Sequence, residues 1–394
     1  MSALDRPRFE RHMPQDPEPT GTTDGRNIDL SLGILAGEAS GLRCSHPEGA
    51  ASVAYDVVPH ADGDGSPTYH GLPILKAPVW KAWIPAYFFT GGVAGASALL
   101  GAIAQVGGGR ALAPIVRPAR WIATVGLATS AALLIVDLGR PARFLNMLRV
   151  FRPTSPMNVG TWIVSGAGAF SGAAAVLPLV GARRLADAAA IASGAFGLGL
   201  ATYTGVLVAN TAVPAWQDGR RVLPLLFSAS AITGAASVLD LVPGLGARPR
   251  RAIRIFGILG RVAELAAGGL YTHELRARGE VVSRVLAHGR SGALWHASEL
   301  LTLASLACSL FGGRSRGARI AGGVLGIAGS LATRFAVMEA GKASARDPRA
   351  TFEPQRRDRE ERERAARDRA AGERARIERP RVPAPAFASP AAVL

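Results

Sequence analysis

Eight apolar stretches, each long enough to cross a bilayer, follow one another between Ile84 and Ala340. A helix that spans the hydrocarbon core needs about 20 mostly apolar residues. The stretches that meet this length are roughly 84–106, 120–138, 160–180, 188–209, 223–242, 252–273, 292–311 and 319–340. They predict an all-α integral membrane protein in which eight transmembrane helices form a bundle.

Polar segments flank these stretches. Residues 1–69 are rich in Asp, Gly, Pro and His without sustained periodicity, and they predict a disordered arm without a signal peptide. Residues 70–345 form the expected membrane domain. Residues 346–394 are a charged tail, in which the mixed-charge run 355–364 predicts a solvated helix held by i,i+4 pairs before a disordered end.

Composition supports a membrane bundle and argues against other classes of protein. Apolar residues make up 48% of the 394 residues and charged residues only 19%, and the 47 glycines suit close packing between membrane helices. The net charge of +16 comes almost entirely from arginines in short loops and in the tail, which favours anchoring at lipid headgroups over binding of nucleic acid. The two cysteines are too few for an iron–sulfur cluster, which normally takes four thiolates.

The number of spans and the loop charges predict the topology. With eight spans both termini lie on one side of the membrane, termed here the N face. More lysines and arginines flank the spans at this face than at the other, so the positive-inside rule favours cytoplasmic termini. The expectation is a multi-pass protein of the cytoplasmic (inner) membrane.

A few polar residues inside the spans are the candidate functional groups, because a charge in hydrocarbon is costly and usually serves function. Helix direction and the rise of about 1.5 Å per residue place most of them in the N-face half of the membrane. They are Tyr87, Asp137, Tyr203, Arg261, Glu264, Glu299 and Arg334, whereas Asp240 belongs at the opposite face. This distribution predicts a polar pocket that opens towards the N face and takes a lipid-soluble ligand with a polar head. A quinone fits, since Tyr or Arg can donate hydrogen bonds to its carbonyls and carboxylates can exchange its protons.

Structural explanations for the same residues remain open. Arg261 with Glu264, and Glu299 with Arg334, can be ion pairs that neutralise one another within the bundle. Tyr87 can belong to an interfacial aromatic belt. Asp137 lies in a sequence typical of a helix end.

Metal sites find little support in the sequence. Only His273 and His296 lie in or at spans, so one axial pair for haem is conceivable but not favoured. No other metal-ligand spacing occurs, and we expect no metal in this chain.

Two long segments resemble a known family. Residues 69–100 (YHGLPILKAPVWKAWIPAYFFTGGVAGASALL) resemble the first helix of the NrfD-type family, the membrane subunit of polysulfide reductase and its relatives. Residues 137–162 (DLGRPARFLNMLRVFRPTSPMNVGTW) resemble that family's loop between the second and third helices. Shorter matches occur at 203–205, at 214–216 and at 334–348, so that the resemblance covers about residues 69–356.

The resemblance implies an eight-helix anchor that handles quinone or quinol, with neither haem nor an iron–sulfur cluster in this chain. It implies two partners, a four-cluster ferredoxin-like iron–sulfur subunit and a catalytic subunit of the molybdenum type or similar. Electrons would pass between the iron–sulfur subunit and membrane quinone, either menaquinone or ubiquinone.

The resemblance also suggests roles for individual residues. The family's quinone pocket, at the start of the first helix and the end of the fourth, corresponds to Tyr87 and Tyr203. We expect Asp137 and Arg334 to complete the pocket. Ile84 departs from the family, because some members have a polar side chain there. Relatives in larger complexes are thought to move protons, and Arg261, Glu264, Glu299 and Asp240 are the candidates for a proton route.

Two other functions use the same features. An ion- or proton-coupled transporter or channel would also need buried charges, but such proteins usually contain internal repeats and broken helices. No convincing repeat relates residues 84–209 to 223–340. A purely structural anchor, whose pocket has decayed, would fit the change at Ile84.

Overall fold

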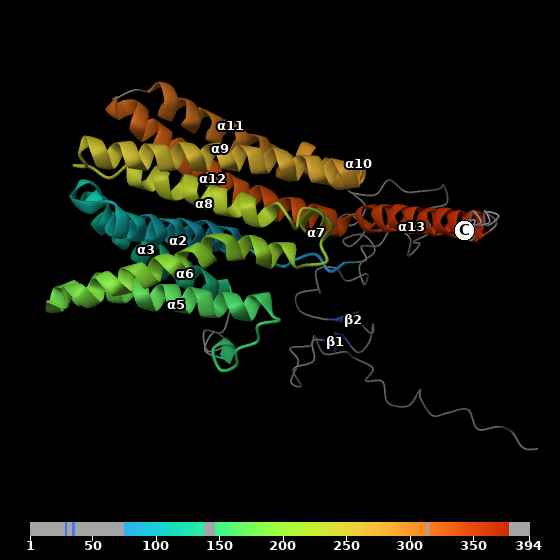
Figure 1. Cartoon of the computed structure of the whole chain (residues 1–394), viewed down its shortest axis with the longest axis horizontal. Helices are drawn as coiled ribbons and strands as arrows, with labels where there is room; N and C mark the ends of the chain where they lie inside the picture. Colours follow the sequence, from blue (N-terminus) through green and yellow to red (C-terminus); the bar gives the residue numbers. More distant parts are fainter. Residues whose placement is uncertain (1–27, 30–33, 36–74, 138–145, 313–314, 378–394) are drawn as a thin grey trace, which may run out of the picture. The chain divides into compact units, whose positions relative to one another are not determined.

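The computed structural model describes residues 28–29, 34–35, 75–137, 146–312 and 315–377, and it consists mainly of long helices (Figure 1). Eight long helices make up the bundle, which confirms the expected all-α membrane fold. They are α2 (Trp83–Gly107), α3 (Gly109–Asp137), α5 (Pro156–Val176), α6 (Arg183–Ala209), α8 (Leu223–Asp240), α9 (Ala247–Arg278), α11 (Gly289–Phe311) and α12 (Arg316–Arg346). Two short strands, β1 (Ile28–Asp29) and β2 (Ile34–Leu35), pair antiparallel.

Among the described residues, seven of the eight long helices of the bundle are apolar enough to cross a membrane, and α9 is the exception. Its apolar stretch contains Arg261 and Glu264, and four arginines stand in its first two turns. Both buried charges point into the bundle, where α9 packs against α8 and α11. Because these charges are covered by protein, the length and packing of α9 suit a membrane helix despite its composition.

Small residues bring the central helices into backbone contact. Helix α2 packs against α3, α6, α8 and α12, and it is the most deeply buried of the spans. A Cβ atom on Gly95 of α2 would lie 2.5 Å from the carbonyl oxygen of Gly197 on α6. Only glycine allows this approach, which lets van der Waals contact hold membrane helices together. The contact fixes α2 and α6 relative to each other.

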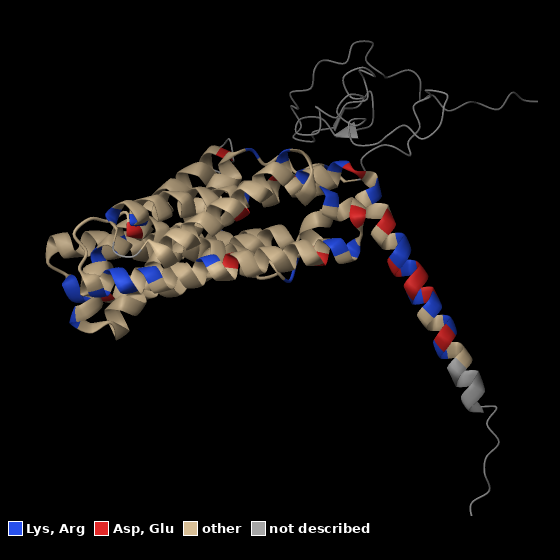
Figure 2. Cartoon of the chain, turned by 90° about the horizontal axis from the view of Figure 1, so that it is seen from above, with Lys and Arg blue, Asp and Glu red and all other residues tan. Residues whose placement is uncertain are grey.

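Charged residues gather at the two ends of the bundle and leave its middle largely uncharged (Figure 2). At the N face the Asp218 carboxylate lies 3.3 Å from Arg278. At the opposite face Asp187 lies 2.6 Å from Arg120 and joins α6 to α3. This pattern is the one expected where headgroups and water meet both ends of a transmembrane bundle.

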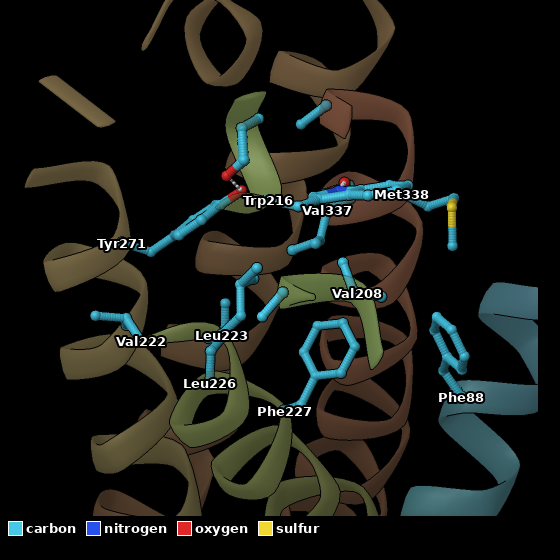
Figure 3. Close-up of a cluster of buried hydrophobic side chains, with 14 of the residues drawn as sticks. Phe88, Val208, Trp216, Val222, Leu223, Leu226, Phe227, Tyr271, Val337 and Met338 are labelled. Atoms are coloured by element: carbon cyan, nitrogen blue, oxygen red, sulfur yellow. Dashed lines mark hydrogen bonds between the residues drawn. The ribbon is translucent and has the colours of Figure 1, made fainter. Parts of the chain in front are cut away.

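Three short helices were not predicted from the sequence: η3 (Leu177–Val180), α7 (Pro214–Asp218) and α10 (Glu280–Ala287). Of these, α7 is held by Trp216, which is fully buried and donates a hydrogen bond from Nε1 to the Val337 carbonyl of α12 at 2.7 Å (Figure 3). Trp216 also stacks on Trp80, with ring centroids 5.6 Å apart. A Cβ on Gly341 would lie 1.9 Å from Trp216, so glycine is needed where α7 meets α12.

Helix α13 (Pro348–Ile377) belongs mostly to a separate unit, Thr351–Leu394. It is longer than the run 355–364 that predicted it. The Arg359 guanidinium lies 2.9 Å from the Glu363 carboxylate one turn away, and this hydrogen bond lowers the pKa of Glu363. The expected disorder of residues 1–69 and of the final residues concerns segments that lie mostly outside the described residues, and the domain boundaries stay a prediction.

Candidate functional site

Two buried tyrosines from different helices interact near the N face. Tyr87 on α2 is 3% exposed and Tyr203 on α6 is 7% exposed. The two phenol groups lie close enough to influence each other electrostatically. Neither hydroxyl has a hydrogen-bond partner among the described residues, although buried tyrosine hydroxyls usually find one. Both can therefore donate to a ligand.

Helix α5 forms a close wall behind Tyr203. A Cβ on Gly160 would lie 1.7 Å from the Tyr203 ring and 1.9 Å from its hydroxyl, so the phenol rests directly on the α5 backbone. The start of α5 is fixed by Asn158, whose amide donates to the carbonyls of Met147 and Val150 at 2.9 Å each. The position of Tyr203 thus depends on a glycine that the sequence analysis did not single out.

Aromatic side chains connect Tyr87 to a buried arginine. The ring centroids of Tyr87 and Phe88 are 5.4 Å apart. Those of Phe88 and Phe227, which Figure 3 shows, are 6.0 Å apart. The Arg334 guanidinium lies over the Phe227 ring at 4.0 Å from the centroid, and its Nη2 donates to the Phe227 carbonyl at 2.6 Å. This cation–π contact partly stabilises a charge in an apolar environment. Arg334 is almost fully buried, and its Nε and Nη1 have no partner in the described part of the chain.

Glu264 of α9 lies among hydroxyl groups from two neighbouring helices. Its Oε1 accepts a hydrogen bond from Thr333 of α12 at 2.8 Å. The hydroxyls of Thr233 and Ser230, both on α8, lie near the carboxylate, and Oε2 and the Thr233 hydroxyl have no hydrogen-bond partner in the described part of the chain. Arg334 interacts with Glu264 electrostatically. The carboxylate is therefore solvated by protein hydroxyls rather than by a direct ion pair.

Arg261 pairs with Asp240, which the sequence analysis left apart from the cluster. Its Nη2 lies 3.7 Å from the Asp240 carboxylate and donates to the Ser237 hydroxyl at 3.0 Å. Its Nε donates to the Ser305 hydroxyl at 2.6 Å. The interaction of Arg261 with Glu264 is electrostatic only, without the direct ion pair that their i,i+3 spacing allowed. The ion pair runs from α9 to the end of α8.

The remaining candidates lie away from this interior cluster. The Glu299 side chain of α11 is 37% exposed and lies 3.6 Å from His296, so no ion pair joins it to Arg334. Asp137 is the last residue of α3, partly buried and engaged in interactions of its own. His273 and His296 are both exposed. In the residues that the structure describes, no group of three or more His, Cys, Asp or Glu side chains is placed to hold a metal ion.

The hydroxyl groups of α8 were missed from the sequence. Ser230, Thr233 and Ser237 follow one another at i, i+3 and i+7, so they share one face of the helix. That face meets Arg261 and Glu264 of α9. A search for polar residues at helical spacing inside apolar spans would have found them, since polar side chains within membrane helices often bond across helices.

Comparison with known families agrees with this architecture. None of the curated proteins matches the chain. The model of a polysulfide reductase family, NrfD_2, matches residues 67–346. The match covers more than half of the chain, and it includes all eight long helices of the bundle and every candidate site residue. The chain is therefore a multi-pass membrane protein that belongs to the NrfD-type polysulfide reductase family.

Proposed function

We propose that this chain is the quinone-handling membrane subunit of an oxidoreductase complex, which exchanges electrons between membrane quinone or quinol and an iron–sulfur partner. One observation carries the proposal: Tyr87 and Tyr203 are buried residues close enough to influence each other electrostatically, and their hydroxyls have no hydrogen-bond partner among the described residues. A phenol hydroxyl can donate one hydrogen bond, and a quinone has carbonyl oxygens that accept it. Membership of the polysulfide reductase family supports the same reading.

The surroundings of the two tyrosines suit a planar, mostly apolar ring. Phe88 is fully buried beside Tyr87, and Ile84 is buried one turn earlier on the same helix. Aromatic rings favour stacked or edge-on contacts with another ring, and an apolar wall excludes water from it. Ile84 supplies such a wall where some family members carry a polar group. Bound quinone would supply the two-electron, two-proton chemistry, while the tyrosines would orient its carbonyls.

The polar interior offers a path for the protons. We propose that Glu264 exchanges protons with the pocket along a water route lined by Arg334, whose guanidinium orients the water as a hydrogen-bond donor and whose Nη2 lies 3.3 Å from where a Cβ on Gly92 of α2 would be. Six buried atoms without a full partner gather here: Thr233 Oγ1, Arg261 Nη1, Glu264 Oε2, Thr302 Oγ1, Arg334 Nε and Arg334 Nη1. Buried polar atoms of this kind are normally satisfied by ordered water, so we expect water molecules to complete the route. Arg261 and Asp240 extend it towards the opposite face.

The N face is the proposed docking side for the partners. The pocket tyrosines lie nearest this face, so an iron–sulfur subunit bound there would place a cluster closest to the quinone. The exposed arginines Arg220, Arg221, Arg276 and Arg284 give this face a positive charge that suits an acidic partner. A catalytic subunit would then attach through the iron–sulfur subunit. The side of the membrane that the N face occupies, the quinone type and the direction of electron flow stay predictions.

The test is quinol-linked turnover of the purified complex. Tyr87→Phe and Tyr203→Phe each remove one hydroxyl and keep the ring. We expect each to lower kcat/KM for quinol by about 2- to 13-fold, which corresponds to about 0.5–1.5 kcal/mol for one hydrogen bond. Tyr271→Phe is the matched control, because the Tyr271 hydroxyl already donates to the Ala215 carbonyl at 3.0 Å.

Two results would overturn the proposal. The first is normal quinol turnover in the Tyr87→Phe/Tyr203→Phe double variant. The second is a purified protein that carries neither quinone nor an iron–sulfur partner. A proton flux through such a protein in vesicles would then favour the transporter, for which the buried cluster of Asp240, Arg261 and Glu264 is the supporting observation. No flux would favour the structural anchor.

A further inference from the structure

The end of the bundle opposite the N face carries an excess of positive charge around the end of α8. Arg250 stands in the first turn of α9, and Arg316 and Arg319 stand in the first turn of α12. Arg319 interacts electrostatically with both other arginines and with Asp240. Asp240 is already paired with Arg261 at 3.7 Å. Asp240 therefore interacts with three guanidinium groups, those of Arg250, Arg261 and Arg319, while Arg319 is also repelled by Arg250 and Arg316. One carboxylate does not compensate all of this positive charge.

Two of these arginines are held in place with their terminal nitrogens free. Arg319 donates from Nε to the Asp240 backbone carbonyl at 3.0 Å, and Arg250 donates from Nε to the Leu245 carbonyl at 2.6 Å. Both side chains are partly buried. Their Nη atoms have no hydrogen-bond partner within the described residues. A guanidinium fixed through Nε presents its other N–H groups in a fork, which matches the oxygen atoms of a phosphate.

Lipid-facing apolar side chains continue from this cluster into the membrane. Arg316, Ile320 and Val324 follow one another at i, i+4 and i+8 on α12, and the last two are 39% and 54% exposed. Ile255 and Leu259 form a similar exposed line on α9 beyond Arg251. Each step of four residues descends about 6 Å along a helix. The cluster therefore stands at headgroup depth, directly above surface that suits acyl chains.

We propose that Arg250, Arg316 and Arg319 bind the phosphodiester headgroup of an anionic phospholipid. The first-turn N–H groups of α9 and α12 lie at the same end of the bundle, and they favour a negative charge there. The headgroup supplies the anion that the cluster lacks, and the acyl chains lie along the exposed line on α12. A zwitterionic lipid carries its own cation and gains less from the cluster. This site lies outside the proposed quinone pocket and does not depend on it.

Native mass spectrometry of the full-length protein, purified in mild detergent, tests the site. Phosphatidylglycerol is the anionic probe and phosphatidylcholine the zwitterionic one. An arginine near the surface contributes about a fivefold gain in binding of anionic lipid, so we expect Arg316→Gln to weaken phosphatidylglycerol binding about fivefold and Arg316→Gln/Arg319→Gln about 30-fold. The matched control is Arg183→Gln/Arg184→Gln, which removes two exposed charges at the same face. It should bind phosphatidylglycerol as the unmodified protein does.

Three outcomes would overturn the proposal. Equal loss of phosphatidylglycerol binding in the control and the test variants would mean a diffuse charge effect. Equal binding of phosphatidylcholine and phosphatidylglycerol would remove the charge selectivity. Displacement of the lipid by millimolar inorganic phosphate would identify the site as one for a soluble anion. If substitution of Arg319 impairs folding, Arg316→Gln still decides, because the Arg316 side chain is exposed and makes no protein hydrogen bond in the described part of the chain.

Discussion

Gly160→Ala should displace Tyr203 without removing any polar group. The new Cβ would lie 1.7 Å from Cζ of the Tyr203 ring, whereas carbon atoms in contact are normally about 3.5–4.0 Å apart. The ring tip must therefore move by about 2 Å, or α5 must move away. Gly168 is the matched control on the same helix, because a Cβ there meets nothing within 4 Å.

Two consequences of Gly160→Ala can be measured separately. Overpacking at this contact should destabilise the protein by about 1–3 kcal/mol, read from thermal denaturation in detergent. A displacement of the hydroxyl by about 2 Å breaks its hydrogen bond to substrate, so kcat/KM for quinol should fall by the same 2- to 13-fold, roughly, as in Tyr203→Phe. Gly168→Ala should leave turnover unchanged and stabilise α5 slightly, because alanine favours the helix over glycine by about 1 kcal/mol.

A double-mutant cycle decides whether the effect runs through the hydroxyl. If Gly160→Ala acts by moving the Tyr203 hydroxyl, it should lower turnover much less when Tyr203 is already Phe. Unchanged turnover in Gly160→Ala would refute the reasoning, since the tyrosine would then have no part in substrate binding. If the effects of Gly160→Ala and Tyr203→Phe on turnover are fully additive in the double variant, Gly160 acts through some other group.

The structure also distinguishes the two candidate glutamates: Glu264→Gln should lower quinone-linked proton uptake in vesicles, whereas Glu299→Gln, the same change at a half-exposed site, should not. Loss of proton uptake in Glu299→Gln alone would restore the role that the sequence analysis assigned to it and would exclude the route through Glu264. Gly341→Ala should destabilise the protein by about 1–3 kcal/mol or more, because the new Cβ would overlap the buried Trp216 ring, and thermal denaturation measures the change. Gly269→Ala should not destabilise the protein, because a Cβ at Gly269 has open space. Equal melting temperatures for the two variants would contradict the tight contact at Trp216.

The sequence predicted the depth of a residue in the membrane better than it predicted the face of the helix on which the side chain lies. The count of residues from each span end brought Tyr87 and Tyr203 to the same half of the membrane, and the structure places them close enough to influence each other electrostatically. The same count put Glu299 at the level of the pocket, but its side chain lies on a more exposed side of α11. Rise per residue is constant in any α-helix, whereas the face that a side chain presents depends on how neighbouring helices pack.

Partner choice among the buried charges also required the tertiary structure. Arg261 and Glu264 are one turn apart, and this local spacing suggested an ion pair. The structure instead places Asp240, from the next helix, beside Arg261 and gives Glu264 a hydroxyl from Thr333. Interhelical contacts of this kind depend on register, which no local pattern in the chain encodes. For a related reason α7 was missed, because five residues with a proline at the start read as a loop.

The backbone contact between Gly95 and Gly197 affects how the spacing of Tyr87 and Tyr203 depends on the thickness of the bilayer. Tyr87 stands about two turns from this contact on α2, and Tyr203 stands less than two turns from it on α6. Membranes of different thickness change the tilt of spans, at a cost that is small for each ångström of mismatch. An outer helix such as α11 can absorb that tilt, whereas α2 and α6 must move together, and α5 must follow α6 because the Tyr203 ring rests on Gly160. The spacing of the two phenols is thus set by peptide backbone and stays the same in thin and thick membranes.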